Sequence, residues 1–365
     1  MNFARTLFAS TIALTLLAGP LAAQTSADHM LPGDRAIPRY THIFVIVEEN
    51  KDYETIMNGK SAPGFSRFAH TYGNASQFFG ETHPSEANYV ALLAGSTFGI
   101  HDDDAFFCHP GTVKTFCSKA AAEPGYADHT ITALHLGDQL TAAGLTWKGY
   151  YESIPAPGSL AIVGDSGGSE DAYYAAKHSG FLNFANVQTD PHRAELITTF
   201  EALAHDRAAG TMPNFALIVP NQCNEMHGLS GKNVPADCHD AASLITRGDV
   251  YTAKLVDELM NTASWKSSEN DAIVITFDEG SGGSRGGCCG NDPNSVANYG
   301  SGRIPTIVVT NHGPRGLDDP TPYNHYSLLR TIEDAFGITT HLQLAGAVDS
   351  GVRPMTPLFA VRASR

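Results

Sequence analysis

Basic residues are scarce in this sequence. Its 365 residues include 23 Lys and Arg against 38 Asp and Glu, which gives a formal net charge of −15. Nucleic acids and anionic membranes would repel such a chain, so both are excluded as electrostatic partners. Apolar residues make up 42% and charged residues 17%, which excludes disorder for the bulk of the chain. An anionic substrate would need local positive charge, and the 16 His residues fit a metal site.

The sequence also lacks internal repeats, coiled-coil heptads and a second long apolar segment. Its strongly apolar stretch, residues 7–18, follows a basic start and leads to small residues before position 24, the pattern of a cleaved export signal over 1–23. A membrane anchor is the alternative, but the stretch is short for the ~30 Å of a bilayer core. We therefore predict a secreted or periplasmic protein with one catalytic domain over 24–365, no stable membrane anchor and no obligate protein partner.

Cysteine is limited to six residues, none before Cys108. They stand at positions 108, 117, 223, 238, 288 and 289. Sequence does not fix their pairing, although Cys108–Cys117, Cys223–Cys238 and a vicinal Cys288–Cys289 bond would each close a short loop. A zinc site is the alternative, but no C-x-x-C pair occurs and an exported protein more often oxidises its thiols. Disulfides are therefore the prediction.

Four short runs are apolar without interruption, as expected of parallel strands buried on both faces. They cover residues 43–47, 215–219, 272–277 and 307–309. Apolar residues at helical spacing lie between the runs, as in residues 249–260. Alternating strand and helix signals predict an α/β fold with a doubly wound sheet.

Polar side chains follow three of these runs directly. Glu49 and Asn50 follow the first, Asn221 the second, and Asp278 and Glu279 the third. Open α/β sheets bind ligands outside the carboxyl ends of their strands. Solvated turn residues explain most single cases of this kind, but three endings together predict an oxygen-rich site for a divalent cation.

Ser85 is the candidate nucleophile. A strand is expected over residues 74–79 and a helical run over 90–94, which places Ser85 at a helix N-terminus. Unpaired N–H groups and the helix dipole make that position suitable for a phosphate or an alkoxide. Ser85 could instead only cap the helix, and Asn88 has the same two interpretations.

Two histidines join the candidate set. His227 lies shortly after Asn221, on the loop leaving the second strand, and His325 begins a helix with an apolar face. A lone His is more often structural than functional. The neighbouring polar residues favour the functional interpretation here.

Five ordered motifs then resemble a known family, the bacterial phosphoesterases of the secreted acid phosphatase and phospholipase C type, within the alkaline phosphatase superfamily. The motifs are VEENKDY at 47–53, HPSEANY at 83–89, PNQCNEMH at 220–227, FDE at 277–279 and HYSLLRTIED at 325–334. LTWKGY at 145–150 and GRIP at 302–305 are similar as well. The resemblance implies an alkaline-phosphatase-like sandwich, with a central, mostly parallel sheet flanked by helices on both faces.

The resemblance also implies roles for individual residues. Ser85 would be the nucleophile, with His227 and His325 beside the phosphate or in proton transfer. The implied metal ligands are Glu49, Asn50, Asp278 and Glu279, and the implied substrate-binding residues are His83, Asn88, Asn221 and Arg303. The sequence departs from the family at Glu225, where Asp is common, and at Gly228, where another acid is common. We expect one divalent ion, Mg, Ca, Mn or Zn, because the fuller His and Asp set for two ions is missing.

Three functions are consistent with these residues. The first is a secreted, metal-dependent phosphomonoesterase that works through a phosphoserine, with a phosphorylated small molecule or a phospholipid as substrate. The second is a phospholipase C-type phosphodiesterase, which would use the same residues. The third is a protein that binds metal or phosphate without turnover, although no reactive position is missing. The Gly-rich loop 280–292 is either a lid over the site or a surface loop tied by cysteines.

Overall fold

The structure is a computed structural model, and it describes residue 1 and residues 36–106, 128–164, 171–290 and 300–361. The predicted export signal at 1–23 and the Cys108–Cys117 pair lie outside the described residues. Residues from Ala36 onward group as one compact unit. No helix in the described ranges is long and apolar enough to cross a membrane.

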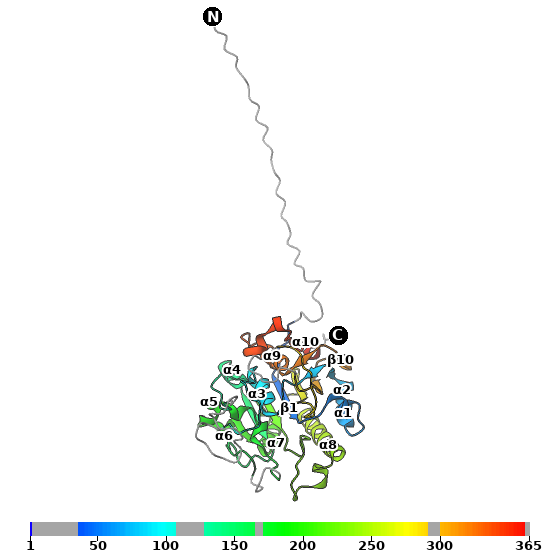
Figure 1. The fold of residues 1–365 in the computed structure, drawn as a ribbon. Helices are drawn as coiled ribbons and strands as arrows, with labels where there is room; N and C mark the ends of the chain where they lie inside the picture. The colour runs from blue at the N-terminus through cyan, green and yellow to red at the C-terminus, as the bar shows by residue number, and fades with distance from the viewer. Residues whose placement is uncertain (2–35, 107–127, 165–170, 291–299, 362–365) are drawn as a thin grey trace. The chain divides into compact units, whose positions relative to one another are not determined.

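An eight-stranded sheet forms the centre of this unit (Figure 1). Its spatial order is β10, β2, β9, β7, β1, β6, β4, β5. The strands are β1 His42–Glu48, β2 Gly73–Ala75, β4 Trp147–Tyr151, β5 Ile197–Thr199, β6 Phe215–Val219, β7 Asp271–Phe277, β9 Thr306–Thr310 and β10 Leu317–Asp319. The central strand β1 pairs in parallel with both β6 and β7. The three predicted apolar runs that precede polar residues are thus adjacent parallel strands, and their carboxyl ends lie at one edge of the sheet.

The fourth predicted run is a strand, but its predicted direction is wrong. β9 pairs antiparallel with β7 and with β2. All five of its residues are buried. Burial on both faces produces a continuous apolar run whichever way the strand points, so the run carried no information on direction.

The single strand expected over 74–79 is also wrong. The chain turns at residues 76–77, so that β2 ends at Ala75 and β3 Phe78–Phe79 belongs to a second sheet. This smaller sheet has the order β11, β3, β8, where β8 is Arg303–Ile304 and β11 is Tyr323–Asn324. The turn brings the segment before Ser85 next to the segment that carries Arg303.

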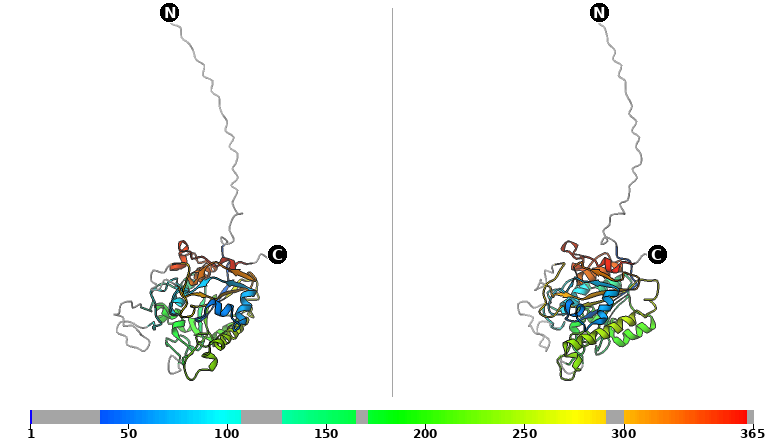
Figure 2. Two further views of the ribbon diagram at one scale, coloured as in Figure 1. Left: turned by 45° about the vertical axis from the view of Figure 1, so that its right-hand side comes forward. Right: turned by 90° about the vertical axis from the view of Figure 1, so that its right-hand side faces the viewer.

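Helices cover the sheet on both sides. Figure 1 shows α1, α2 and α8 on one side of β1 and α3, α4 and α9 on the other, and α8 is the long yellow-green helix of Figure 2. The helices are α1 Tyr53–Met57, α2 Pro63–Thr71, α3 Glu86–Ala94, α4 Leu136–Ala142, α5 Ala185–Thr189, α6 Arg193–Leu196, α7 Phe200–Ala209, α8 Ala241–Leu259, α9 His325–Ala335 and α10 Thr356–Phe359. The helix predicted over 249–260 therefore begins earlier, where Asp240 accepts a hydrogen bond from the Ser243 N–H.

Two disulfides are present among the described residues. Cys223–Cys238 joins the loop after β6 to the segment before α8, and Cys288–Cys289 joins neighbours in the chain. The first bond closes a loop that contains His227.

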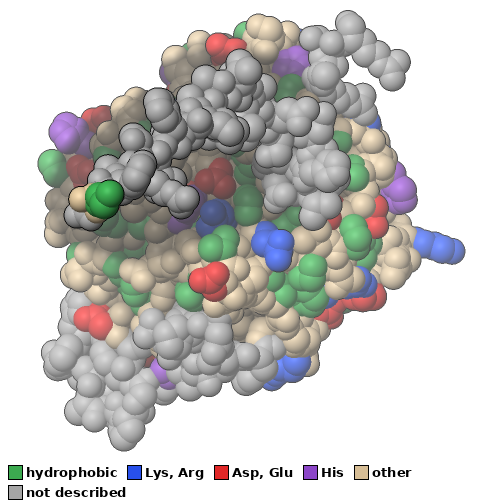
Figure 3. All heavy atoms as spheres, turned by 90° about the horizontal axis from the view of Figure 1, so that it is seen from above, with side chains coloured by type: hydrophobic (Ala, Val, Ile, Leu, Met, Phe, Trp, Pro, Cys, Tyr) green, Lys and Arg blue, Asp and Glu red, His purple; other side chains and the backbone are tan. Residues whose placement is uncertain are grey.

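On the face seen in Figure 3, acidic and basic side chains are interspersed with hydrophobic ones.

Candidate active site

Ser85 directly precedes α3, but its side chain does not cap the helix. Its backbone is already helical, with φ −50° and ψ −51°, and the hydroxyl makes no capping hydrogen bond. Every residue of α3 is buried, and Ser85 itself is 2% exposed. The helix is fixed by packing, so the hydroxyl is available for another partner.

That partner is the polar segment after β1. Ser85 Oγ donates to Glu49 Oε2 at 3.0 Å, and Asn50 Oδ1 and Glu279 Oε1 each lie 3.5 Å from Oγ. The fourth predicted ligand, Asp278, accepts a hydrogen bond from the Asn50 N–H at 3.1 Å. The structure therefore brings the predicted nucleophile and all four predicted metal ligands to one edge of the sheet.

Asn50 owes its place to a turn. Its φ is +56°, in the left-handed region that Asn tolerates better than most residues. The chain bends there after leaving β1, and Asn50 Oδ1 lies 3.5 Å from Ser85 Oγ. Lys51 then donates to the Met226 carbonyl at 2.7 Å, so the turn is joined to the loop after β6.

Four buried carboxyl groups share this site. Burial raises the pKa of Glu49 and of Glu225 well above the ordinary value, and neighbouring carboxylates raise both further. Burial also raises the pKa of Asp278, and burial together with Asp278 raises the pKa of Glu279 to about 10. Asp278 Oδ2 and Glu225 Oε2 have no hydrogen-bond partner among the described residues. Unpartnered buried carboxylate oxygens are a donor set that fits a divalent cation.

A second set of candidate ligands overlaps the first at Glu49. Ligand atoms of Glu49, His178 and His227 all lie within 4.8 Å of one another. His178 Nε2 lies 3.3 Å from Glu49 Oε1, and His178 Nδ1 lies 2.7 Å from Glu225 Oε1. Two imidazoles and a carboxylate suit zinc and other transition metals.

Tyr89 supports this second set. Its hydroxyl donates to Glu49 Oε1 at 2.7 Å. Its ring stacks on the His178 ring, with centroids 5.6 Å apart and an interplanar angle of 14°. Tyr89 therefore orients both a carboxylate and an imidazole of the site, as partners of metal ligands do.

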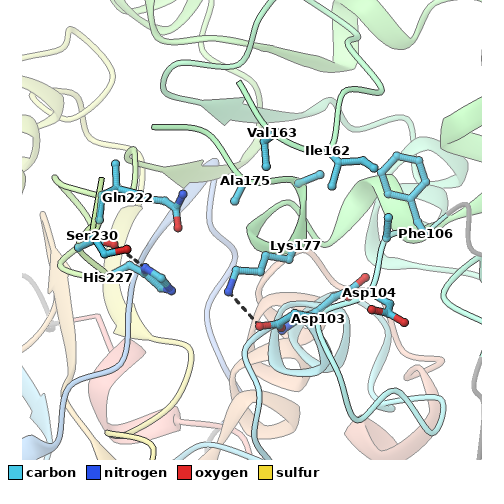
Figure 4. A pocket seen from close by; sticks show the side chains of 15 residues that line it. Asp103, Asp104, Phe106, Ile162, Val163, Ala175, Lys177, Gln222, His227 and Ser230 are labelled. Carbon is cyan, nitrogen blue, oxygen red and sulfur yellow. Dashed lines mark hydrogen bonds and ion pairs between the residues drawn. The ribbon is translucent and has the colours of Figure 1, made fainter. Parts of the chain in front are cut away.

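Sequence reasoning missed His178 and Lys177. Both belong to the short 3-10 helix Ala176–His178, which follows no predicted strand and carries no helical periodicity. Lys177 Nζ lies 2.9 Å from Asp103 Oδ2 (Figure 4). Although burial opposes it, Asp103 and Glu49 hold the pKa of Lys177 above its usual value.

The two predicted catalytic histidines lie in different surroundings. His227 Nδ1 donates to the Gly228 carbonyl at 2.8 Å. Burial, and after it the positive charge of Lys177, lowers the pKa of His227 to about 4. His325 uses both ring nitrogens, one with the Glu81 carboxylate and the other, Nε2, with the Phe277 carbonyl at 2.9 Å. His325 thus holds the backbone just before Asp278.

His83 and Asn88 shape the segment that carries Ser85. His83 Nδ1 lies 2.7 Å from Glu279 Oε2, and its Nε2 donates to the Ser284 carbonyl at 2.9 Å. Asn88 Oδ1 accepts from the N–H groups of residues 81 and 82, and its amide donates to the Thr82 carbonyl at 2.9 Å. Asn88 therefore closes the loop before Ser85.

The side chains of Asn221 and Arg303 make their contacts outside the cluster around Ser85. Asn221 Oδ1 accepts from the N–H groups of Cys223 and Asn224, both at 3.2 Å, and so forms the turn after β6. Arg303 pairs with Glu54 and lies over the Tyr53 ring at 4.2 Å. The hydrogen bonds of both side chains are made away from Ser85.

The Gly-rich loop is anchored where it leaves the site. The Asp52 carboxylate accepts from the Ser281 hydroxyl at 2.7 Å and also from the Ser284 hydroxyl. A Cβ at Gly280 would stand 2.6 Å from the backbone carbonyl oxygen of Ser301, so only glycine fits there. The loop after β7 is thereby attached to the segment after β1.

This geometry is compatible with phosphoester cleavage, and comparison with known proteins identifies the family. Residues 58–339 match the Phosphoesterase family, and the chain belongs to that family. A phosphatidylinositol-3-phosphatase of Mycobacterium tuberculosis is 31% identical over 83% of this chain and 79% of its own length. The chain is a hydrolase that acts on phosphate esters.

Two fungal relatives are longer. A probable acid phosphatase of Kluyveromyces lactis is 24% identical over 80% of this chain and 58% of its own length. An acid phosphatase of Aspergillus fumigatus is 26% identical, with coverage of 82% and 55%. The chain spans a little over half the length of these two proteins.

A solved structure confirms the predicted fold. A Vibrio parahaemolyticus protein of the alkaline phosphatase superfamily superposes with a TM-score of 0.51 at 10% identity, covering 82% of this chain and 67% of that one. At this identity the likeness concerns the fold alone. The alkaline-phosphatase-like α/β architecture predicted from the motifs is therefore confirmed.

Proposed function

We propose that this protein is an exported, metal-dependent phosphomonoesterase that works through a phosphoserine at Ser85. The observation that carries the proposal is the contact between Ser85 Oγ and Glu49 Oε2 at 3.0 Å, with Asn50 and Glu279 oxygens at 3.5 Å. A hydroxyl among buried carboxylates and an amide is a nucleophile placed beside ligands for a cation. Residues 24–365 would act as one catalytic domain after removal of the signal at 1–23. The buried Cys223–Cys238 bond supports an oxidising compartment, periplasmic or extracellular.

The metal would be held by Glu49, Asn50, Asp278 and Glu279. When bound, it would supply the positive charge that favours the ionised Ser85 hydroxyl and polarises the phosphoryl group. The oxygen-only set favours Mg, Ca or Mn, whereas a site that also recruits His178 and His227 favours Zn.

The chain's own residues account for the other parts of the reaction. Ser85 Oγ loses its proton and forms a bond to phosphorus while the bond from phosphorus to the ester oxygen breaks, and the leaving oxygen takes up one proton in exchange for the one that Oγ gave up. A water molecule then attacks the phosphoserine, the bond from phosphorus to Oγ breaks, and Ser85 regains its proton. The N-terminus of α3 favours negative charge at Ser85 during both steps.

His227 is the residue we place beside the leaving oxygen. Its Nδ1 hydrogen is fixed by the Gly228 carbonyl, so Nε2 is the ring nitrogen left for the substrate side. His325 has both nitrogens occupied by Glu81 and Phe277. We therefore assign His325 to positioning Asp278 rather than to proton transfer.

A phospholipase C-type phosphodiesterase is the alternative. Ser85 and the carboxylates would serve either reaction. The related proteins are all named as phosphatases, including one named for a phosphoinositide. Those names favour monoester cleavage and include a phospholipid headgroup among the candidate substrates.

The test compares hydrolysis of an aryl phosphate monoester and a phosphocholine diester by the purified mature protein, across pH and with a chelator. We expect faster monoester cleavage that the chelator abolishes and added divalent ions restore. Preference for the diester would replace the phosphatase with a phospholipase C, and full activity after complete metal removal would exclude metal dependence.

Ser85→Ala tests the nucleophile. Turnover should fall by about 10³-fold or more with an unchanged thermal transition, and acid-quenched wild type, but not the variant, should carry a phosphoryl group by intact mass. Ser243→Ala is the matched control, because Ser243 is exposed in the first turn of α8. An active Ser85→Ala protein would overturn the assignment.

A further inference from the structure

A cavity of about 360 Å³ opens beside the candidate site. Its lining includes His227 and Lys177, which belong to the site or adjoin it. Its other wall is apolar and includes Phe106, Ile162 and Val163. Figure 4 shows His227 and Phe106 at opposite ends of the view, with Lys177 between them. The cavity therefore has a polar end at the site and an apolar end away from it.

In-line displacement requires such a space. The leaving oxygen lies on the far side of phosphorus from the attacking oxygen, so the group attached to it must extend away from Ser85. A cavity that shares His227 with the site and continues to Ile162 and Val163 offers that room.

We propose that this cavity binds the leaving group of the phosphate monoester, and that its occupant is a compact, uncharged group such as one ring or a short branched chain. The inference rests on the proposed function and adds the substrate class. Three side chains decide the specificity: Phe106, Ile162 and Val163.

Size limits the occupant. A volume of about 360 Å³ lies at the lower end of the ~300–1,000 Å³ of small-ligand pockets. One ring fits such a space, whereas the two acyl chains of a diacylglycerol do not. A lipid substrate would have to leave its chains outside the cavity.

Charge limits the occupant as well. Lys177 is the only Lys or Arg among the described residues that line the cavity, and it lies 2.9 Å from Asp103. The charge of Lys177 is thus already matched by the Asp103 carboxylate, which leaves no cation among these lining residues for an anionic leaving group. A neutral leaving group is therefore favoured.

Two alkyl phosphates test the assignment. Benzyl phosphate and methyl phosphate are both esters of primary alcohols, so they differ mainly in the apolar group that the cavity would receive. Each methylene held in an apolar pocket contributes about tenfold or more to kcat/KM. We expect the wild type to prefer benzyl phosphate by at least about tenfold.

Variants of the apolar wall locate the effect. Val163→Phe, which fills the cavity, should lower the ratio of benzyl to methyl kcat/KM by about tenfold or more, and Ile162→Ala, which removes contacts, by about fivefold or more. Leu160→Ala is the matched control, because Leu160 is 38% exposed and does not belong to the lining. It should leave the ratio unchanged. Turnover of methyl phosphate shows that each variant is folded.

The outcomes separate the two proposals. If the wild type cleaves neither ester, the proposed function fails. If it cleaves both but shows no preference, or if the wall variants leave the ratio unchanged, the phosphatase stands and the leaving-group cavity is wrong. A ratio that falls only in the wall variants supports the cavity.

Discussion

His129 Nδ1 lies 2.8 Å from Glu86 Oε2, in an ion pair whose side chains are 1% and 2% exposed. Glu86 is the residue directly after Ser85, so this pair fixes the start of α3 next to the proposed nucleophile. Asp102 lies on the other side of the imidazole, 3.0 Å from Nε2. The position of Ser85 therefore depends on this buried ion pair.

Removal of His129 should destabilise the protein strongly. His129→Ala leaves the Glu86 carboxylate buried without its cation, and such losses cost about 3–5 kcal/mol. Urea unfolding measures the change. His192→Ala is the control, because His192 pairs with Glu195 on the surface and should change the free energy of unfolding by less than about 1 kcal/mol. Equal effects of the two substitutions would contradict the structural role of the pair.

The same pair predicts a pH dependence. Burial alone would lower the pKa of His129, but the charge of Glu86 and the hydrogen bonds that His129 donates to Asp102 and Glu86 raise it from 6.5 to about 10. A raised pKa of a cation stabilises the fold fully below pH 6.5, and that contribution is lost as pH rises through 10. The difference in unfolding free energy between wild type and His129→Gln should therefore shrink steadily between pH 6.5 and 10. A difference that grows over this range would rule out a protonated His129.

Tyr89 should control metal affinity. Tyr89→Phe removes the hydrogen bond to Glu49 but keeps the ring on His178, and losses of this kind weaken metal binding by about 10–100-fold. Competition with a coloured chelator measures the affinity. Tyr72→Phe, which loses only a contact with Met260, should bind metal as the wild type does. Unchanged affinity in Tyr89→Phe would place the metal away from Glu49.

The Cys223–Cys238 bond should stabilise the loop that carries His227. The bond spans 15 residues, and closing a loop of that length contributes about 3 kcal/mol. The double variant Cys223→Ser/Cys238→Ser should unfold at lower urea concentration and lose activity before global unfolding. The Cys288–Cys289 bond closes almost no loop. The double variant Cys288→Ser/Cys289→Ser should therefore change the free energy of unfolding far less. The reverse order of effects would contradict this assignment.

The sequence predicted the site through strand ends and a helix start. Glu49, Asn50, Asp278 and Glu279 follow buried strands, and the neighbours of those strands in the sheet bring them together. His178 and Lys177 could not be found that way, because a 3-10 helix between irregular segments carries no periodic signal. Only the packing of distant segments places them at the site.

The sequence also predicted part of the fold. The apolar runs located β1, β6 and β7, and the motifs identified the superfamily architecture. The direction of β9 was missed because burial on both faces is the same in parallel and antiparallel strands. The break between β2 and β3 was missed because residues 76–77 carry no Gly or Pro to mark the turn.

The partners of Ser85 are far apart along the chain, since Glu49 precedes it by 36 residues and Glu279 follows it by 194. In the proposed mechanism, a nascent chain synthesised only through β6 holds Ser85, Glu49 and Asn50 but lacks Asp278 and Glu279, so it would not cleave a phosphate ester. Catalytic competence would therefore be acquired late, when β7 joins β1. The recovery of turnover after dilution from denaturant would report the completion of the central sheet.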